Sequence, residues 1–153
     1  NVVQGASLVN ASVISVIDKP SKELGAFDFG ATNVDIPYYD VVVDTTGKKV
    51  MREGGYKRLS KNGKLILAGV PFEGETLEID SYDIHGGKQI IGCHGGDTKP
   101  DTDIPRYLKL YSLGKLKLKE QITHIFPLEK INEAIDVVRR GNAGRCLVSM
   151  NAH

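Results

Sequence analysis

Tyr39-Asp40-Val41-Val42-Val43-Asp44-Thr45-Thr46-Gly47 is the most informative segment of this sequence for its fold class. Three consecutive valines put apolar side chains on both faces of an extended segment, which is typical of a strand in a parallel sheet covered by helices. The Thr-Thr-Gly sequence ends that strand, and the residues that follow, to about Leu59, favour a helix. A buried strand, a turn and a helix in this order predict the βαβ unit of an α/β domain.

The same alternation extends outward in both directions along the chain. Short β-branched or aliphatic runs predict strands, and apolar residues at helical spacing predict helices between them. The expected strands are residues 13–17, 30–35, 39–44, 64–69, 89–93, 122–126 and 146–150. The expected helices are residues 2–9, 19–29, 48–59, 103–113 and 128–141, with Asp103 as the N-cap of the fourth and Pro105 in its first turn.

The composition restricts the class of protein. A chain of 153 residues with 41% hydrophobic and 25% charged residues can form a compact domain with a sizeable core. Lys and Arg total 20 against 19 Asp and Glu, so a net charge of +1 creates no global field for nucleic acid or an anionic membrane. The apolar runs are too short for a membrane span, and the two cysteines lack CxxC spacing. We expect a soluble, cytoplasmic domain with no nucleic acid or membrane partner.

Asp18 follows the expected strand 13–17, at a place where an acidic residue of a βα unit can hold a ribose. Its carboxylate can accept hydrogen bonds from the 2′- and 3′-hydroxyls of an adenosine ribose and would repel a 2′-phosphate. The alternative is an N-cap for the helix that begins at Lys19. The GxGxxG fingerprint that accompanies a ribose-binding acid is absent and would precede Asn1. We therefore expect this chain, whose first residue is not Met, to be a piece of a longer protein.

Several stretches, in order along the chain, match one family pattern. The most specific is Ile122–Ala134, ITHIFPLEKINEA, which is similar to ITHxxPLExINEAF. Asp40–Gly47 is similar to a DVVxDxTG strand, and Leu67–Pro71 to an hhGVP turn. Further matches are Asn1–Asp18 with a first helix and second strand, Phe29–Thr32 with an FGAT step, and Arg140–Arg145 with an R-G…GR ending. Together they cover nearly the whole chain, which resembles the zinc-dependent medium-chain alcohol dehydrogenases.

The resemblance implies a set of residues that bind a nicotinamide dinucleotide. Asp18 matches the acid on the adenosine ribose, which favours NAD over NADP, and Lys19 lies beside it. The other matches fall into three groups. Thr46, Gly47 and Lys48 match the wall around the adenine and its ribose; Ala68, Gly69, Val70, Cys93 and His94 match backbone contacts to the nicotinamide carboxamide; Arg145 matches an arginine on the pyrophosphate.

Each of these residues also has a purely structural interpretation. Residues 68–70 can be an ordinary strand end, and Arg145 can be a surface charge near a sheet edge. His85 and His94 flank glycines, but as zinc ligands they would need further Cys, His or carboxylate partners. Only Cys93 is near them in sequence. We therefore predict no metal site in this chain and interpret His124 as a structural histidine.

The implied fold is a Rossmann-like, doubly wound parallel sheet that lacks its first strand, with a stub of the catalytic domain. Residues 1–95 are expected to form the NAD-binding domain, truncated at its N-terminus. Residues 96–153 are expected to hold the last Rossmann strands and helices and the edge of the catalytic domain. The family's catalytic zinc is held by an N-terminal domain outside this sequence, so no catalytic residue is assigned.

The implied function is binding of NAD(H) in an oxidoreductase that transfers a hydride between an alcohol or polyol and the nicotinamide, assisted by zinc in the full-length parent. This chain alone is expected to be inactive, and the protein to be a homo-oligomer, a dimer or a tetramer. One alternative is a zinc-free NADPH-dependent quinone or enone reductase of the same superfamily, against which Asp18 argues. The other is a non-catalytic module for nucleotide binding or dimerisation.

Overall fold

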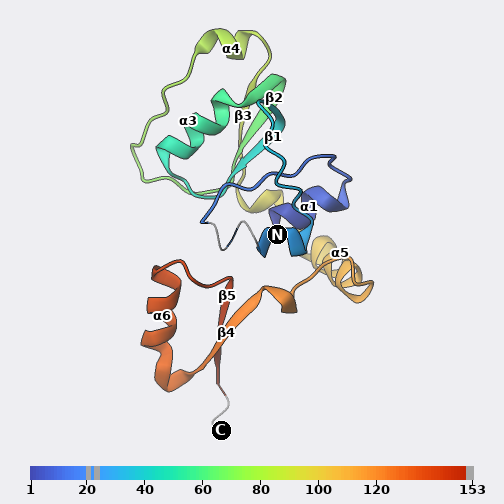
Figure 1. Cartoon of the computed structure of the whole chain (residues 1–153), viewed down its shortest axis with the longest axis vertical. Helices are drawn as coiled ribbons and strands as arrows, with labels where there is room; N and C mark the ends of the chain where they lie inside the picture. Colours follow the sequence, from blue (N-terminus) through green and yellow to red (C-terminus); the bar gives the residue numbers. More distant parts are fainter. Residues whose placement is uncertain (20–21, 23–24, 151–153) are drawn as a thin grey trace. The chain divides into compact units, whose positions relative to one another are not determined.

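The chain forms two compact units in the computed structural model, which describes residues 1–19, 22 and 25–150. We name residues 34–103 the central unit, and residues 1–33 together with those from 104 onward the terminal unit. Every strand pair in either unit is parallel (Figure 1). This mixture of helices with parallel strands is the α/β class that the sequence predicts.

The central unit is a three-stranded parallel sheet with a helix against it. β1 (Tyr39–Asp44) pairs with β2 (Leu59–Leu67), which pairs in turn with β3 (Gln89–Gly92). α3 (Lys49–Lys57) connects β1 to β2, and α4 (Ser81–His85) precedes β3. β1 therefore lies at one edge of this three-stranded sheet, and the expected strands 64–69 and 89–93 follow it in spatial order.

The core of the central unit lies between α3 and the sheet. Tyr56 of α3 and Leu59 and Leu65 of β2 are at most 2% exposed. Gly55 lets α3 approach β1, because a Cβ added at that position would lie 2.9 Å from Val42 Cγ1. A glycine that lowers helix propensity therefore permits the packing of this helix. Four partly buried side chains complete the core: Val42, Leu67, Ile79 and Ile90.

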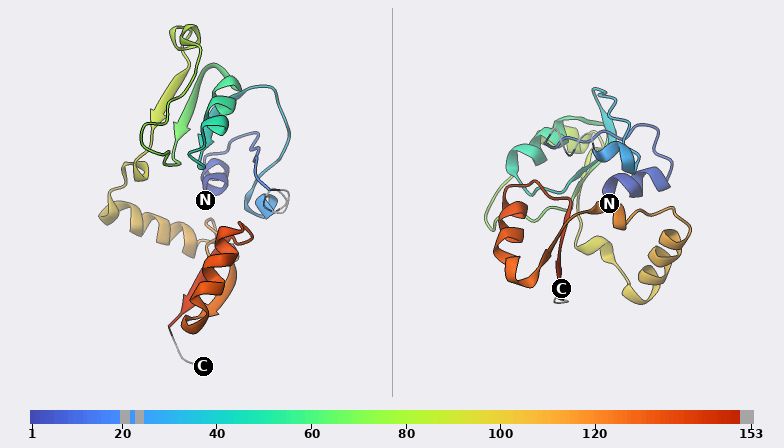
Figure 2. Two further views of the ribbon diagram at one scale, coloured as in Figure 1. Left: turned by 90° about the vertical axis from the view of Figure 1, so that its left-hand side faces the viewer. Right: turned by 60° about the horizontal axis from the view of Figure 1, so that its bottom comes forward.

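The terminal unit contains a second parallel strand pair. β4 (Ile122–Pro127) pairs with β5 (Arg145–Ser149), and α6 (Ile131–Arg139) connects them. Figure 2 shows α6 lying along this pair, where it buries Ala134. α1 (Val2–Leu8) belongs to the same unit. α5 (Pro100–Ser112) crosses the sequence boundary between the units, and 3-10 turns lie at Phe27–Phe29 (η1), Gly95–Asp97 (η2), Lys119–Gln121 (η3) and Leu128–Lys130 (η4).

A buried glutamine holds α1 to the segment before β4. Gln4 is only 4% exposed, its Nε2 donates to the carbonyl of Lys117 at 3.0 Å, and its Oε1 accepts from the amide of Lys117 at 2.6 Å. One side-chain amide thus pairs with both backbone groups of one residue, as a neighbouring strand would. Lys117 Nζ also donates to the carbonyl of Asp28 at 2.5 Å.

Two strands expected from the sequence, residues 13–17 and 30–35, are not strands. The two segments are nevertheless bonded to each other. The amide of Ile14 donates to Thr32 Oγ1 at 2.9 Å, and the amide of Val16 donates to Asn33 Oδ1 at 3.2 Å. Side-chain oxygens therefore accept hydrogen bonds from backbone amides that would otherwise pair two neighbouring strands. Asn33 also has φ of 45°, which turns the chain away from an extended conformation.

The fourth helix begins earlier than its sequence predicts. α5 starts at Pro100, which fills the favoured first helical position, whereas Pro105 lies inside the helix. Asp103 is not its N-cap, since it sits within the helix and its carboxylate accepts a hydrogen bond from the amide of Lys99 at 2.9 Å. The expected helix 19–29 is described only in part: residues 22 and 25–26 are helical and η1 follows, while residues 20, 21, 23 and 24 lie outside the described residues.

Candidate functional site

Three loops meet where the strands of the central unit end. β1 ends at Asp44, β2 at Leu67 and β3 at Gly92, and register places Asp44 beside Leu67 and Leu67 beside Gly92. Because the strands are parallel, the segments that follow them leave from the same edge of the sheet. In open α/β sheets this carboxyl edge is where ligands bind.

Asp44 joins two of these loops. Its carboxylate accepts hydrogen bonds from the amide of Thr46 at 3.0 Å, the hydroxyl of Thr46 at 2.7 Å and the amide of Gly47 at 2.9 Å. Its backbone carbonyl accepts from the amides of Ala68 and Gly69, at 2.9 and 2.8 Å. The residue is 6% exposed, so its charge is buried but well supplied with donors. Asp44 therefore fixes the loop after β1 to the loop after β2.

The same two loops touch backbone to backbone through glycines. A Cβ added at Gly69 would lie 2.3 Å from the amide nitrogen of Gly47, and one added at Gly47 would lie 2.4 Å from the carbonyl oxygen of Val70. Gly47 also has φ of 69°, in the left-handed region that glycine adopts at little cost. Neither position can accept a side chain without moving backbone, so both glycines are required for this contact.

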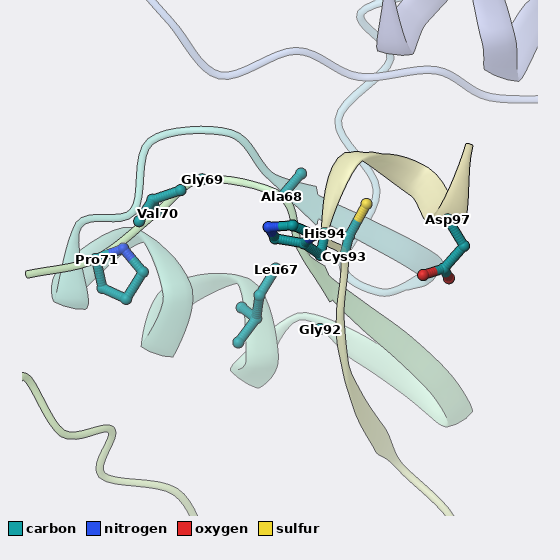
Figure 3. A pocket seen from close by; sticks show the side chains of 9 residues that line it. All are labelled: Leu67, Ala68, Gly69, Val70, Pro71, Gly92, Cys93, His94 and Asp97. Atoms are coloured by element: carbon teal, nitrogen blue, oxygen red, sulfur yellow. The ribbon is translucent and has the colours of Figure 1, made fainter. Parts of the chain in front are cut away.

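A hollow of about 400 Å³ opens beside these loops (Figure 3). The ends of β2 and β3 and the segments that follow them form its wall, and the amide of Cys93 donates to the carbonyl of Leu67 at 3.1 Å. Glycines at 69 and 92 keep part of the wall as bare backbone. The lining residues are Leu67, Ala68, Gly69, Val70, Pro71, Gly92, Cys93, His94 and Asp97.

The structure brings together the predicted site residues of the central unit. Five of them, Ala68, Gly69, Val70, Cys93 and His94, line the hollow. The group at 46–48 lies against the same loops: Thr46 and Gly47 are bonded to Asp44, and the amide of Lys48 donates to Thr46 Oγ1 at 3.1 Å. Their predicted contacts with a cofactor stay predictions.

The other three predicted residues lie in the terminal unit. Asp18 Oδ1 accepts a hydrogen bond from the amide of Lys19, the next residue, at 2.7 Å. This bond does not distinguish the ribose and helix-cap interpretations of the carboxylate, and both remain predictions. Lys19 Nζ donates to the carbonyl of Arg140 at 2.5 Å. Arg145 is the first residue of β5 and is exposed.

Sequence reasoning missed two acidic residues of this site. Asp44 stands inside the DVVVDTTG stretch, but as a strand end it gave no sign that its carboxylate would hold the next loop. Asp97 lines the hollow although it stands three residues after His94. The signal that could have found it is the preceding Gly95-Gly96 pair, which predicts a tight turn back toward β3.

The described residues do not supply a metal centre. Among them, no group of three or more His, Cys, Asp or Glu side chains is placed to hold a metal ion. Cys93, His94 and Asp97 share the hollow without forming such a group. In the same part of the chain, none of the helices has both the length and the apolar character that a bilayer span requires.

Comparison with known proteins relates nearly the whole chain to dehydrogenases. A probable S-(hydroxymethyl)glutathione dehydrogenase of Schizosaccharomyces pombe is 32% identical over 97% of this chain and 44% of its own length. Other curated relatives include alcohol dehydrogenases of Zea mays and Arabidopsis thaliana. This chain therefore spans less than half the length of the curated relatives it matches. No protein-family model matches the sequence.

Solved structures give the same result for the fold. One similar structure is an alcohol dehydrogenase zinc-binding domain protein from Burkholderia ambifaria, with a TM-score of 0.89 and 26% sequence identity. The match covers 98% of this chain and 45% of the Burkholderia chain. A second is a zinc-binding dehydrogenase from Sinorhizobium meliloti bound to NADP, with a TM-score of 0.75 and 21% sequence identity. This match covers 87% of this chain and 44% of the Sinorhizobium chain. The family resemblance and the Rossmann-like fold predicted from the sequence are confirmed.

Proposed function

Since this chain is a homologue of the zinc-dependent medium-chain alcohol dehydrogenases, we propose that it forms the nucleotide-binding part of an oxidoreductase. The reaction is transfer of a hydride from the hydroxyl-bearing carbon of an alcohol to NAD⁺, which gives a carbonyl compound, NADH and a proton. The observation that carries the proposal is the hollow at the carboxyl edge of the central sheet, with Asp44 fixing two of its loops.

The residues around the hollow fit the nicotinamide end of a dinucleotide. A flat, polar carboxamide needs backbone donors and acceptors at close range, and the glycines at 69 and 92 leave backbone without a side chain in front of it. The segment 68–70 and the pair Cys93 and His94 would hold the carboxamide. The cofactor supplies the hydride chemistry; this chain binds it and sets the orientation of its ring.

The wall at residues 46–48 would border the adenine and its ribose, and Arg145 would pair with the pyrophosphate. Asp18 is the residue expected to select NAD over NADP, because its carboxylate repels a 2′-phosphate. Zinc, in the longer relatives, would polarise the alcohol oxygen; the described residues of this chain do not hold it. A homo-oligomeric state and a cytoplasmic location stay predictions. Sedimentation equilibrium tests the oligomeric state.

Binding of the cofactor to the full chain tests the proposal directly. Titration with NADH, followed by amide resonances in ¹⁵N-labelled protein, is expected to shift residues 68–70 and 93–94 first, with the amides of α4 as an internal reference. Saturable shifts at these positions would support the proposal. Shifts that are absent at millimolar NADH, or that are confined to the terminal unit, would contradict it.

A pair of glycine variants gives the matched control. A Cβ added at Gly92 meets no atom within 4 Å, so Gly92→Val should keep the fold while occupying space in the hollow, and NADH affinity should fall about tenfold or more. Gly54 in α3 also has open space around its Cβ, but it lies away from the hollow lining. Gly54→Ala should leave the affinity unchanged.

The cofactor preference is tested at Asp18. Asp18→Ser removes the charge that would repel a 2′-phosphate, so the ratio of NADP to NAD affinity should rise about tenfold or more. Asp28→Ser, at an acidic residue of the same unit with no predicted cofactor contact, is the control. If the ratio of NADP to NAD affinity is unchanged in Asp18→Ser, Asp18 does not select the cofactor and only its helix-cap interpretation remains.

A further inference from the structure

The hollow carries one carboxylate whose role the proposed function leaves open. Of its nine lining residues, Asp97 is the only acidic one, and none is Lys or Arg. We propose that Asp97 shifts the relative affinity of this site toward the oxidised, positively charged nicotinamide and away from the neutral reduced ring. The inference rests on the proposed function and adds to it a residue that biases the ratio of NAD⁺ to NADH affinity.

The backbone after β3 brings Asp97 back to the hollow. Gly95, Gly96 and Asp97 have φ values of 63°, 69° and 52°, three successive left-handed residues. The turn is closed by the amide of Asp97, which donates to the carbonyl of His94 at 3.3 Å. Aspartate is among the few residues other than glycine that tolerate this conformation. The position therefore combines a demanding backbone with a charged side chain at the wall of the hollow.

The carboxylate of Asp97 forms no salt bridge among the described residues. The ion pairs found there join other residues. By contrast, the buried carboxylate of Asp44 is supplied with three donors. Asp97 is therefore the one carboxylate among the lining residues, and it is exposed at the wall of the hollow.

The two redox states of the cofactor differ in this region by one charge. The pyridinium ring of NAD⁺ carries a positive charge, the dihydropyridine ring of NADH carries none, and the pyrophosphate and riboses are common to both. A carboxylate at the wall therefore attracts only the oxidised ring. For unit charges about 7 Å apart in a solvent-open site, this attraction corresponds to roughly a three- to tenfold preference.

The experiment measures the affinities of the full chain for NAD⁺ and NADH by isothermal titration calorimetry at one pH near 8. Asp97→Asn keeps the shape of the side chain and the tolerance of left-handed backbone, but removes the charge. The variant is expected to bind NAD⁺ about three- to tenfold more weakly while NADH affinity changes less than twofold. Raising the salt concentration should reduce the difference in NAD⁺ affinity between wild type and Asp97→Asn.

A matched variant separates this effect from general loss of an aspartate. Asp80→Asn changes the N-cap of α4, whose carboxylate accepts from the amide of Tyr82 at 2.9 Å and does not line the hollow. It should leave the NAD⁺ to NADH affinity ratio unchanged. If wild type binds both cofactors and Asp97→Asn keeps the same ratio, the role of Asp97 is overturned and the proposed function stands. If wild type binds neither cofactor, the proposed function fails, and this inference with it.

Discussion

The central and terminal units bury different kinds of side chain, although both consist of parallel strands joined by helices. The central unit buries Tyr56, Leu59 and Leu65 to 2% exposure or less. In the terminal unit the buried apolar residues are smaller, apart from one isoleucine: Ile14, Ala26, Ala31, Ala134 and Ala143. Its most specific long-range contact is polar, from Gln4 to the backbone of Lys117.

The difference shows which part of the molecule can position a ligand by itself. A core of large side chains fixes the sheet of the central unit, and that sheet fixes the loops at its carboxyl edge. Both units leave large apolar side chains exposed, such as Ile125 at 67% in the terminal unit and Val41 at 54% in the central unit, so the difference lies in what they bury. Because the terminal unit buries mostly alanines, its stability depends more on a few directional hydrogen bonds.

The largest expected effect on this comparison comes from Leu65→Ala. Leu65 is completely buried, so its truncation leaves a cavity in the central core and should lower the free energy of unfolding of that unit by about 3 kcal/mol. Native-state hydrogen exchange measures this unit by unit. Ile84→Ala, at a side chain that is 46% exposed, is the control with little expected effect. Equal loss of protection in both units would show that they do not unfold separately.

Gly69→Ala should have the next largest effect. The added Cβ would lie 2.3 Å from the amide nitrogen of Gly47, so the two loops must separate, at a cost of about 2 kcal/mol. The resonances of Thr46 and Gly47 should move and NADH affinity should fall. Gly92→Ala adds the same methyl group where no atom lies within 4 Å and should change stability little. Similar behaviour of the two variants would contradict the close contact of the loops.

Gln4→Ala probes the terminal unit in the same way. It removes both hydrogen bonds to Lys117 and leaves two partly buried backbone groups without that partner, which should cost about 1–2 kcal/mol. Exchange of the Lys117 amide should accelerate, while amides of β2 stay protected. Gln89→Ala, at an exposed glutamine of the central unit, is the control. If Gln4→Ala loses amide protection only in the central unit, Gln4 does not stabilise the terminal unit.

The smallest expected effect is the pH dependence contributed by Tyr56. Burial, and secondarily the carboxylate of Asp83, raises the pKa of the Tyr56 hydroxyl above its ordinary value of 10.0. The folded chain thus keeps this proton when the unfolded chain begins to lose it. The contribution to stability is complete below about pH 10 and is lost as pH rises through the folded-state pKa.

Urea denaturation between about pH 8 and 11 measures this contribution, with Tyr56→Phe as the comparison. The variant should lose the part of the alkaline decline that belongs to this hydroxyl. It should also lose the bond to the carbonyl of Asp80, at 3.3 Å, over the whole range. An identical alkaline slope in the two proteins would show that Tyr56 does not contribute to it.

Much of the fold could be predicted from local patterns, and the failures have local causes. The valines of β1 and the apolar stripe of α6 specify their elements by periodicity alone. Residues 13–17 have the composition of a strand, yet only the carbonyl of Ile14 accepts from the amides of Thr32 and Asn33, the amides of Ile14 and Val16 donate to side chains, and no ladder forms. A propensity scale cannot detect such a partner, because the competing oxygen lies 17 or 18 residues away in the chain.

The candidate site was predicted where it depends on strand ends. Parallel register brings residues 68–70 beside Cys93 and His94, so a correct strand assignment suffices to place them together. Asp97 was missed because its position depends on three successive left-handed residues, which no periodicity encodes. The cofactor contacts of Asp18, Lys19 and Arg145, and a division of the chain near residue 95, stay predictions.

The α/β class, the order of most strands and helices, and the glycines at the carboxyl edge of the central sheet can be inferred from the sequence alone. These follow from short-range properties: side-chain periodicity, β-branching and the conformational freedom of glycine. The bonds of Asp44 to two loops, the close approach of α3 at Gly55 and the place of Asp97 in the lining of the hollow are visible only in the folded chain. Each of these depends on which backbone groups meet after the strands have paired, and pairing joins residues that are far apart in the chain.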